Sequence, residues 1–426
     1  MSLSIKLKQT ATSRPKPLSV KKNAAFNFIG CLCYQGCQWL ITVIVVVLSG
    51  YEDSGVLAYA MAIGNLFLPI ATFNLRTFQV SDLNGEYSDG EYIGFRFVSI
   101  ASAFLIIIPY SIITTEDAAL LLPALIYLLF KMDESICDVL SGIHQKGERM
   151  DYIGISQFAR GVLLVASFAI FLSITQNLEV AVFAVFVACA AMTVFYDLPH
   201  ALRFGSIEVK ISLATVRQLV KAGAPLVLAS ALTSLIVSHA RQTFGNISGA
   251  ELLGIYAAVA TPSILVQAAA RYFYSPLMVP IAAAWNDGKD SRRFPLVVFN
   301  GLKSITFGVG LLGILLILFG PSLLKLIYGP SIATYTGLLV GMVLATAINT
   351  FVYFLCDVLV VCRDLWTPVI ASILGLLPCF LFARLFELRF GMNGINIIII
   401  FSYTICLLIL ALRVLRIIRT ERVQRP

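Results

Sequence analysis

Long apolar runs recur along the whole chain. Each has about 20 residues or more, the length that a helix needs to span the hydrocarbon core of a bilayer. They lie near residues 24–48, 55–80, 95–114, 118–140, 153–173, 179–199, 222–243, 252–285, 295–319, 333–360, 367–385 and 393–415. In a bilayer only helices and closed barrels satisfy their own backbone hydrogen bonds. The pattern predicts an all-α polytopic membrane protein with twelve transmembrane helices.

The composition supports a membrane setting. Hydrophobic residues make up 59% of the 426 residues and charged residues only 13%. A soluble globule of this size needs more polar surface than that. The run at 252–285 is too long for one straight span and contains Pro262, Pro276 and Pro280, so we expect it to kink or to project beyond the bilayer.

Basic residues indicate the orientation, because they stay on the cytoplasmic side during insertion. Most of the 31 Lys and Arg residues fall in the two tails and in alternate loops on one side. Both termini are therefore expected in the cytoplasm. The net charge of +8 is explained by this topology, with some attraction to anionic lipids, better than by nucleic-acid binding.

Cysteines do not form a metal site in this interpretation. Cys31, Cys33 and Cys37 lie in the first run without a nearby histidine or carboxylate. Neighbours two residues apart on a helix point to different sides, which favours packing over metal ligation. We expect neither a metal nor a cofactor.

Similar segments in the two halves indicate a duplication. Ser54-Gly-Val-Leu-Ala-Tyr-Ala-Met-Ala begins the second run, and Leu253-Gly-Ile-Tyr-Ala-Ala-Val-Ala begins the eighth. Parallel six-helix repeats usually enclose a central cavity that opens alternately to either side. The expected organisation is two pseudo-symmetric bundles around such a cavity: a basic tail (1–22), the first bundle (23–202), a cytoplasmic connection (203–221), the second bundle (222–415) and a basic tail (416–426).

Arginines inside the apolar runs are candidates for substrate binding, because an ionisable group in hydrocarbon needs a water-filled cavity or a partner. Arg271 has apolar sequence on both sides, whereas Arg76 ends the second run and is explained equally well by snorkelling to the interface. Their similar places in the two halves predict that both face the cavity. Arg160 and Arg241 are weaker candidates.

Charges in the fourth run lie on one helical face. Lys131, Glu134 and Asp138 follow at i, i+3 and i+7, which fits a structural ion pair slightly better than an ion-coupling site. Arg160 in the fifth run, with Asp197 in the sixth and Asp357 in the tenth, is a candidate to complete such pairs. A further ion-coupling candidate is His239, although a histidine near a helix end usually reaches water.

Polar residues also share one face of the first run. Asn23, Asn27, Tyr34 and Gln38 project within a narrow sector of a helix, and that sector is too polar for lipid. We expect it to border the cavity, where Asn27, Tyr34 and Gln38 are candidates for substrate binding.

One stretch resembles a known family. Asn74-Leu-Arg-Thr-Phe-Gln-Val-Ser-Asp82, followed by Gly85-Glu-Tyr, Tyr92 and Arg96, is similar to a segment of the bacterial polysaccharide flippases. These proteins export O-antigen, capsule and teichoic-acid repeat units and belong to the multidrug/oligosaccharidyl-lipid/polysaccharide superfamily. The number of runs and the six-plus-six organisation agree with this resemblance over nearly the whole chain.

The resemblance implies a function. Such a flippase moves an undecaprenyl-pyrophosphate-linked oligosaccharide across the bacterial inner membrane by alternating access, driven by an ion gradient (Na⁺ or H⁺) or by the membrane potential. Arginine binds pyrophosphate in a bidentate way, which suits Arg76 and Arg271. The carboxylates of the fourth run depart from the positive cavity that the family implies, and coupling to a cation would reconcile them.

Three other functions are alternatives to this one. A non-catalytic membrane scaffold would leave the buried arginines unexplained. A cation-coupled multidrug antiporter of the same superfamily requires an acidic cavity, yet the deepest charge in this sequence is Arg271. A membrane polysaccharide polymerase or ligase requires a large outer loop, and the loops expected on that side are short. The sequence has no Asp-x-Asp, His-x4-Asp or phosphate-binding Gly-rich motif that would indicate such an enzyme.

Overall fold

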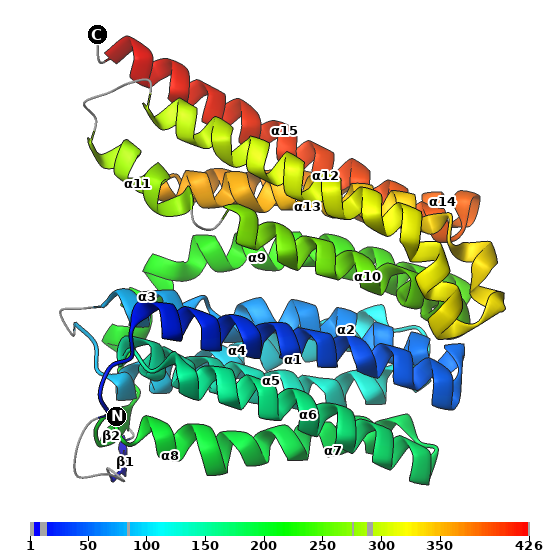
Figure 1. The fold of residues 1–426 in the computed structure, drawn as a ribbon, viewed down its shortest axis with the longest axis horizontal. Helices are drawn as coiled ribbons and strands as arrows, with labels where there is room; N and C mark the ends of the chain where they lie inside the picture. The colour runs from blue at the N-terminus through cyan, green and yellow to red at the C-terminus, as the bar shows by residue number, and fades with distance from the viewer. Residues whose placement is uncertain (1–3, 9–14, 83–85, 275–276, 288–292, 425–426) are drawn as a thin grey trace. The chain divides into compact units, whose positions relative to one another are not determined.

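Two compact units make up the computed structural model, Met1–Val227 (unit 1) and Leu228–Pro426 (unit 2). The structure describes residues 4–8, 15–82, 86–274, 277–287 and 293–424. Almost all of these residues are helical (Figure 1). Each unit is described by itself below.

The helices of unit 1 follow the apolar runs. They are α1 (Val20–Ser49), α2 (Tyr51–Thr72), α3 (Leu75–Ser81), α4 (Asp89–Thr114), α5 (Ala118–Lys146), α6 (Met150–Thr175), α7 (Leu178–Met192), the π-helical turn η1 (Thr193–Asp197), α8 (Leu198–Ala201) and the first part of α9 (Leu213–Ser248). Two short strands, β1 (Ser4–Leu7) and β2 (Ile207–Lys210), pair antiparallel with Ser4 opposite Lys210. They lie at one end of this unit's helices (Figure 1).

Glycines allow α1 and α6 to lie in close contact. A Cβ on Gly30 would come within 2.5 Å of the Gly154 backbone, and a Cβ on Gly154 within 2.3 Å of the Phe26 carbonyl oxygen. Small residues at a helix interface permit this approach, and van der Waals packing then stabilises the pair in a membrane. The two helices are therefore joined along a glycine-lined contact.

Substitutions at two glycines of α1 test this contact. Gly30→Ala is expected to lower the thermal stability of the purified protein, because the added methyl group meets backbone that cannot rotate away. Gly36→Ala is the matched control, since a Cβ at Gly36 meets nothing within 4 Å and alanine favours a helix by about 0.5–1 kcal/mol over glycine. Equal melting temperatures for the two variants would contradict the close contact.

The β-sheet of unit 1 was not predicted. No strand was expected in the first basic tail (1–22) or in the cytoplasmic connection (203–221). The sheet packs against the beginning of α4, where two glycines leave room for β2. A Cβ on Gly90 would come within 1.8 Å of the Glu208 carbonyl oxygen, and one on Gly94 within 2.0 Å of the Lys210 carbonyl oxygen. The described part of the first tail is thus tied to the connection that follows α8.

Unit 2 contains the rest of α9 together with α10 (Ala250–Tyr274), α11 (Met278–Asp287), α12 (Arg293–Tyr328), the 3₁₀ turn η3 (Pro330–Tyr335), α13 (Leu338–Val361), α14 (Trp366–Phe390) and α15 (Met392–Gln424). The long apolar run at 252–285 is divided between α10 and α11. Pro262 lies within α10 and Pro280 within α11, whereas Pro276 lies outside the described residues. Residues 275–276 between these two helices lie outside the described residues, so the expected kink or projection stays a prediction.

Ten helices in the described part of the chain are long and apolar enough to cross a membrane. The chain is therefore a multi-pass membrane protein, as the apolar runs predicted. α5 is not among the ten, because it carries several charged residues. The count of twelve spans, the two six-helix bundles and the boundaries expected for them stay predictions.

Candidate functional site

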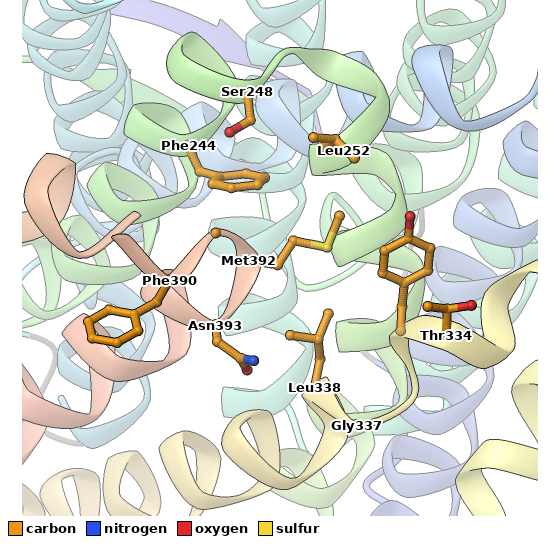
Figure 2. Close-up of a pocket in the computed structure, with 11 residues that line it drawn as sticks. Phe244, Ser248, Leu252, Thr334, Gly337, Leu338, Phe390, Met392 and Asn393 are labelled. Carbon is orange, nitrogen blue, oxygen red and sulfur yellow. The ribbon is translucent and has the colours of Figure 1, made fainter. Parts of the chain in front are cut away.

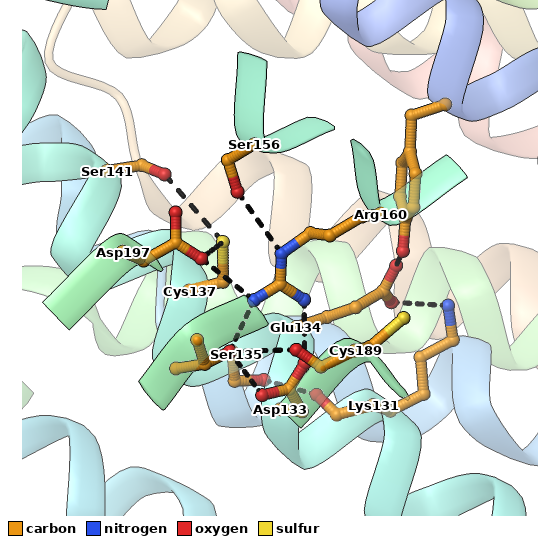
Figure 3. Close-up of polar contacts among 12 residues, drawn as sticks. Lys131, Asp133, Glu134, Ser135, Cys137, Ser141, Ser156, Arg160, Cys189 and Asp197 are labelled. Atoms are coloured by element: carbon orange, nitrogen blue, oxygen red, sulfur yellow. Dashed lines mark hydrogen bonds and ion pairs between the residues drawn. The ribbon is translucent and has the colours of Figure 1, made fainter. Parts of the chain in front are cut away.

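Charged side chains of unit 1 gather around α5 in three clusters. Four charged residues follow one another closely on this helix, Lys131, Asp133, Glu134 and Asp138. Partners come from neighbouring helices of the same unit, and Figure 3 shows the contacts of the first two clusters. An ionic group away from water is costly unless it is paired. How each cluster balances its charge therefore indicates what it can bind.

Arg160 of α6 is the centre of the first cluster, the Arg160 cluster. Its Nη1 lies 2.7 Å from Asp133 Oδ2 and its Nη2 lies 3.0 Å from Asp197 Oδ2. Nη2 also donates to Thr193, whose hydroxyl donates to Asp133. Arg160 and the two aspartates are at most 3% exposed. With one positive and two negative groups, the cluster has a formal charge of −1.

A π-helical turn shapes this cluster. η1 spans Thr193–Asp197 and interrupts the helical segment that begins with α7. Thr193 and Asp197 at its two ends both accept hydrogen bonds from Arg160 Nη2. Such turns are rare and frequently occur at functional sites. The pairing of Arg160 with Asp197 that the sequence suggested is confirmed.

The second cluster, the Lys131 cluster, joins α5 to α1. Lys131 Nζ lies 2.5 Å from Glu134 Oε2. The other carboxylate oxygen accepts hydrogen bonds from the Tyr34 hydroxyl at 2.5 Å and from Gln38 Nε2 at 2.8 Å. Lys131 Nζ also lies 5.3 Å from the centre of the Tyr127 ring. The short distance between Lys131 and Glu134 confirms the ion pair that the sequence suggested. This pair is formally neutral.

The third cluster, the Arg76 cluster, is formed around Asp138. Arg96 Nη2 lies 2.7 Å from Asp138 Oδ2, and Arg96 Nη1 donates to the Ala71 carbonyl oxygen at 2.7 Å. Arg76 approaches the same carboxylate more loosely, at 3.8 Å, while its Nε donates to Gln145 at 2.9 Å. Two arginines against one aspartate give a formal charge of +1.

Exposure separates the members of the Arg76 cluster. The side chain of Arg96 is 1% exposed, whereas those of Arg76 and Asp138 are 28% and 26% exposed. Arg96 already makes a short ion pair with Asp138. The positive excess therefore resides on Arg76, which combines a loose ion pair with an accessible guanidinium. The planar guanidinium of an arginine in this situation can donate two parallel hydrogen bonds to two oxygens of an anionic group such as phosphate.

The stretch that resembles polysaccharide flippases builds the Arg76 cluster. After α2 the chain turns sharply, with positive φ angles at Phe73 (51°) and Asn74 (49°). Asparagine tolerates this conformation, but phenylalanine adopts it rarely, so the turn is held by its surroundings. α3 then begins, and its second residue is Arg76. The turn thus places Arg76 beside α5.

Asp82 directly follows α3 and lies in the connection between α3 and α4. Its carboxylate accepts hydrogen bonds from the amides of Glu86 and Tyr87 and from the Tyr92 hydroxyl. Burial by itself would raise the pKa of Asp82, but these hydrogen bonds lower it below its usual value. Gly85 lies outside the described residues. The motif is therefore a folded corner that positions α3 and the start of α4.

The polar face of α1 forms hydrogen bonds within unit 1, and the cavity expected beside it stays a prediction. Asn23 donates to the carbonyl oxygens of Leu18 and Glu148 and accepts from the amide of Met150. It joins α1 to the α5–α6 connection, a structural role that the sequence did not predict. Asn27 accepts a hydrogen bond from Cys31 on its own helix.

The remaining candidates lie in or beyond α9. His239 stacks on Phe380, with ring centres 4.1 Å apart, and the Arg241 guanidinium lies 6.0 Å from the Tyr256 ring centre. Arg271 is a residue of α10, but its side chain lies outside the described part of the structure. Substrate-binding and ion-coupling roles for these residues stay predictions.

Sequence reasoning missed two buried carboxylates. Asp133 completes the Arg160 cluster, although its position two residues after Lys131 places it off the helical face that the sequence singled out. Glu387 of α14 is 2% exposed, and neither carboxylate oxygen has a hydrogen-bond partner among the described residues. Its place near the end of an apolar run gave no signal of burial. The described residues contain no group of three or more side chains suited to a metal ion.

Comparison with known proteins decides the family. The family model described as "Polysaccharide biosynthesis protein" matches residues 20–283, more than half of the chain. The chain belongs to this family. The capsular polysaccharide biosynthesis protein CapF of Staphylococcus aureus is 26% identical over 314 residues, which cover 72% of this chain and 77% of that protein. The resemblance to polysaccharide flippases is thereby confirmed.

Solved structures show the fold of this polysaccharide biosynthesis protein. An inward-facing multidrug resistance MATE family transporter of the MOP superfamily has a TM-score of 0.73 at 11% identity, covering 93% of this chain and 99% of that one. The lipid II flippase MurJ in an inward closed conformation has a TM-score of 0.71 at 12% identity, covering 92% and 87%. The chain therefore has the fold shared by these two transport proteins.

Proposed function

We propose that this polysaccharide biosynthesis protein is a flippase for an undecaprenyl-pyrophosphate-linked oligosaccharide. The family and the S. aureus relative support a substrate from polysaccharide synthesis. The fold shared with a lipid II flippase supports movement of a lipid-linked sugar. The observation that carries the proposal is the partly exposed Arg76 cluster with its formal excess of one positive charge.

In this mechanism Arg76 binds the pyrophosphate. Arg96 neutralises Asp138 and anchors it to the carbonyl of Ala71, so Asp138 does not cancel the charge of Arg76. A low-dielectric surrounding strengthens each charge-assisted hydrogen bond between the guanidinium and the anion. Arg271 and Arg241 of unit 2 stay candidates for substrate binding, and the lipid tail is proposed to stay in the bilayer.

The ion that drives transport is proposed to act at the Arg160 cluster. Its formal charge of −1 is buried and is balanced by a proton or a monovalent cation. The neighbouring Lys131 cluster links α5 to Tyr34 and Gln38 of α1. A movement of α5 on ion binding would therefore also move α1. Glu134, Asp138, Lys131 and His239 remain candidates for coupling, whereas the enclosed guanidinium of Arg160 favours positioning over substrate contact.

The location completes the proposal. We propose that the protein lies in the bacterial inner membrane. Basic residues that collect in the tails and in alternate loops support a cytoplasmic position for both termini. Transport then runs from the inner to the outer leaflet by alternating access. The proposal includes no chemical reaction of the substrate.

Reconstitution tests the proposed function. Purified protein is placed in liposomes that contain a fluorescent undecaprenyl-pyrophosphate-linked oligosaccharide in both leaflets. We expect an impermeant quencher to reach the inner-leaflet substrate faster than in liposomes without protein. Equal rates would overturn the flippase proposal.

A parallel assay tests the alternative of a multidrug antiporter, which the likeness to a multidrug resistance transporter keeps open. Liposomes with the same protein are loaded with a cationic dye and given a Na⁺ or H⁺ gradient. Gradient-driven dye export without movement of the lipid-linked sugar would replace the flippase by the antiporter.

A further inference from the structure

A pocket in unit 2 lies where three connections meet. Its volume is about 390 Å³, within the range of small-molecule sites, roughly 300–1,000 Å³. The walls come from the α9–α10 connection, from η3 and the start of α13, and from the α14–α15 connection. Phe244 and Ser248 lie along one helix, and Asn393 and Leu338 lie on other elements around the same space (Figure 2).

The floor and the rim of this pocket differ in chemistry. Phe244 is 1% exposed and Leu338 6% exposed, so the floor is apolar and fixed by packing. The rim contains hydroxyl and amide groups from Ser248, Thr334 and Asn393. None of the eleven residues that line the pocket carries a charge. The pocket therefore suits a neutral molecule that has both hydroxyl groups and an apolar face.

A pyranose sugar has this combination, because its C–H groups form an apolar face and its hydroxyls ring the edge. Aromatic side chains pack against such faces, and hydroxyl and amide groups both donate and accept hydrogen bonds. A phosphate would find no cationic partner among the lining residues. The composition of the pocket thus separates it from the Arg76 cluster, where the excess charge is positive.

We propose that this pocket binds one or two neutral sugar units of the transported oligosaccharide. The inference rests on the proposed flippase function for its substrate class. In the expected topology, the end of α9, the start of α10 and the α14–α15 connection all lie on the outer side. The pocket then receives sugar units as they arrive at the outer leaflet.

Protection of an introduced cysteine tests the pocket. The S248C variant of the full chain in lipid nanodiscs is treated with a maleimide, and modification of residue 248 is followed by peptide mass spectrometry. Maltose and N-acetylglucosamine are the neutral probes. A probe at about ten times its Kd occupies most pockets and is expected to slow modification about tenfold. Both membrane faces are accessible in nanodiscs, so the result does not depend on orientation.

A serine outside the pocket provides the matched control. Ser331 is an exposed residue of η3, the same turn that supplies Thr334, but it does not line the pocket. Modification of S331C is expected to be unaffected by either probe. Adding Asn393→Ala to S248C is expected to remove the protection, because the amide is lost from the rim.

Three outcomes would overturn the proposal: no protection of S248C by either neutral sugar, equal slowing of S331C, or protection only by a fatty acid, which would assign the pocket to an acyl chain. Cysteine protection is measured without transport. Failure of the sugar pocket therefore leaves the flippase assay unaffected, and failure of that assay does not remove an observed protection.

Discussion

The Arg160→Met variant is expected to lose most of its folded population. Arg160 is the cation that faces the buried Asp133 and Asp197 carboxylates, at 2.7 and 3.0 Å. Removing one partner of a buried ion pair typically costs about 3–5 kcal/mol, a large part of a protein's net stability. The measurement is the yield of monodisperse protein in detergent and its thermal unfolding followed by tryptophan fluorescence.

Neutralising the carboxylates provides the control for this prediction. In the triple variant Arg160→Met, Asp133→Asn, Asp197→Asn no charge is left unpaired, so most of the lost stability should return. If the single variant Arg160→Met were as stable as the wild-type protein, the cluster would not be what holds α5, α6 and η1 together.

The second large effect is expected for Arg76→Gln, which should lower the rate of sugar-lipid transport about 10- to 100-fold. Hydrogen bonds between charged groups contribute about 1.5–3 kcal/mol each, and glutamine keeps only a neutral donor. Folding should be retained, because Arg76 is 28% exposed and its ion pair with Asp138 is long at 3.8 Å. The measurement is the initial transport rate in liposomes beside the melting temperature.

Two further variants sharpen this prediction. Arg76→Lys keeps the charge but loses the bidentate geometry, so an intermediate rate is expected. Arg217→Gln removes an exposed arginine near the start of α9 and should leave transport unchanged. A loss of transport in Arg217→Gln equal to that in Arg76→Gln would assign the effect to net charge and not to the Arg76 cluster.

The helices were predictable because their signal is local. Each apolar run records its own length without reference to the rest of the chain. The family resemblance was equally local, since the stretch from Asn74 to Arg96 contains the corner and two of the three members of the Arg76 cluster. The β1–β2 pair was missed because its strands lie about 200 residues apart in sequence and are only four residues long each.

The clusters themselves were less predictable, because they depend on how helices are rotated against one another. Spacing on α5 grouped Lys131, Glu134 and Asp138, yet these residues end in two different clusters. Asp133 and Arg160 are 27 residues apart in sequence, and no helical periodicity connects them. The π-helical turn that lets Thr193 and Asp197 reach the same guanidinium is a local change of winding that apolar periodicity does not reveal.

The affinity of the protein for the pyrophosphate headgroup tests the central claim most directly. Purified wild-type protein and Arg76→Gln are titrated with undecaprenyl pyrophosphate in nanodiscs at low and high salt. The account predicts that the wild type binds about 10- to 100-fold more tightly and that salt narrows the difference. Equal dissociation constants at low salt would contradict binding of the headgroup by the Arg76 cluster.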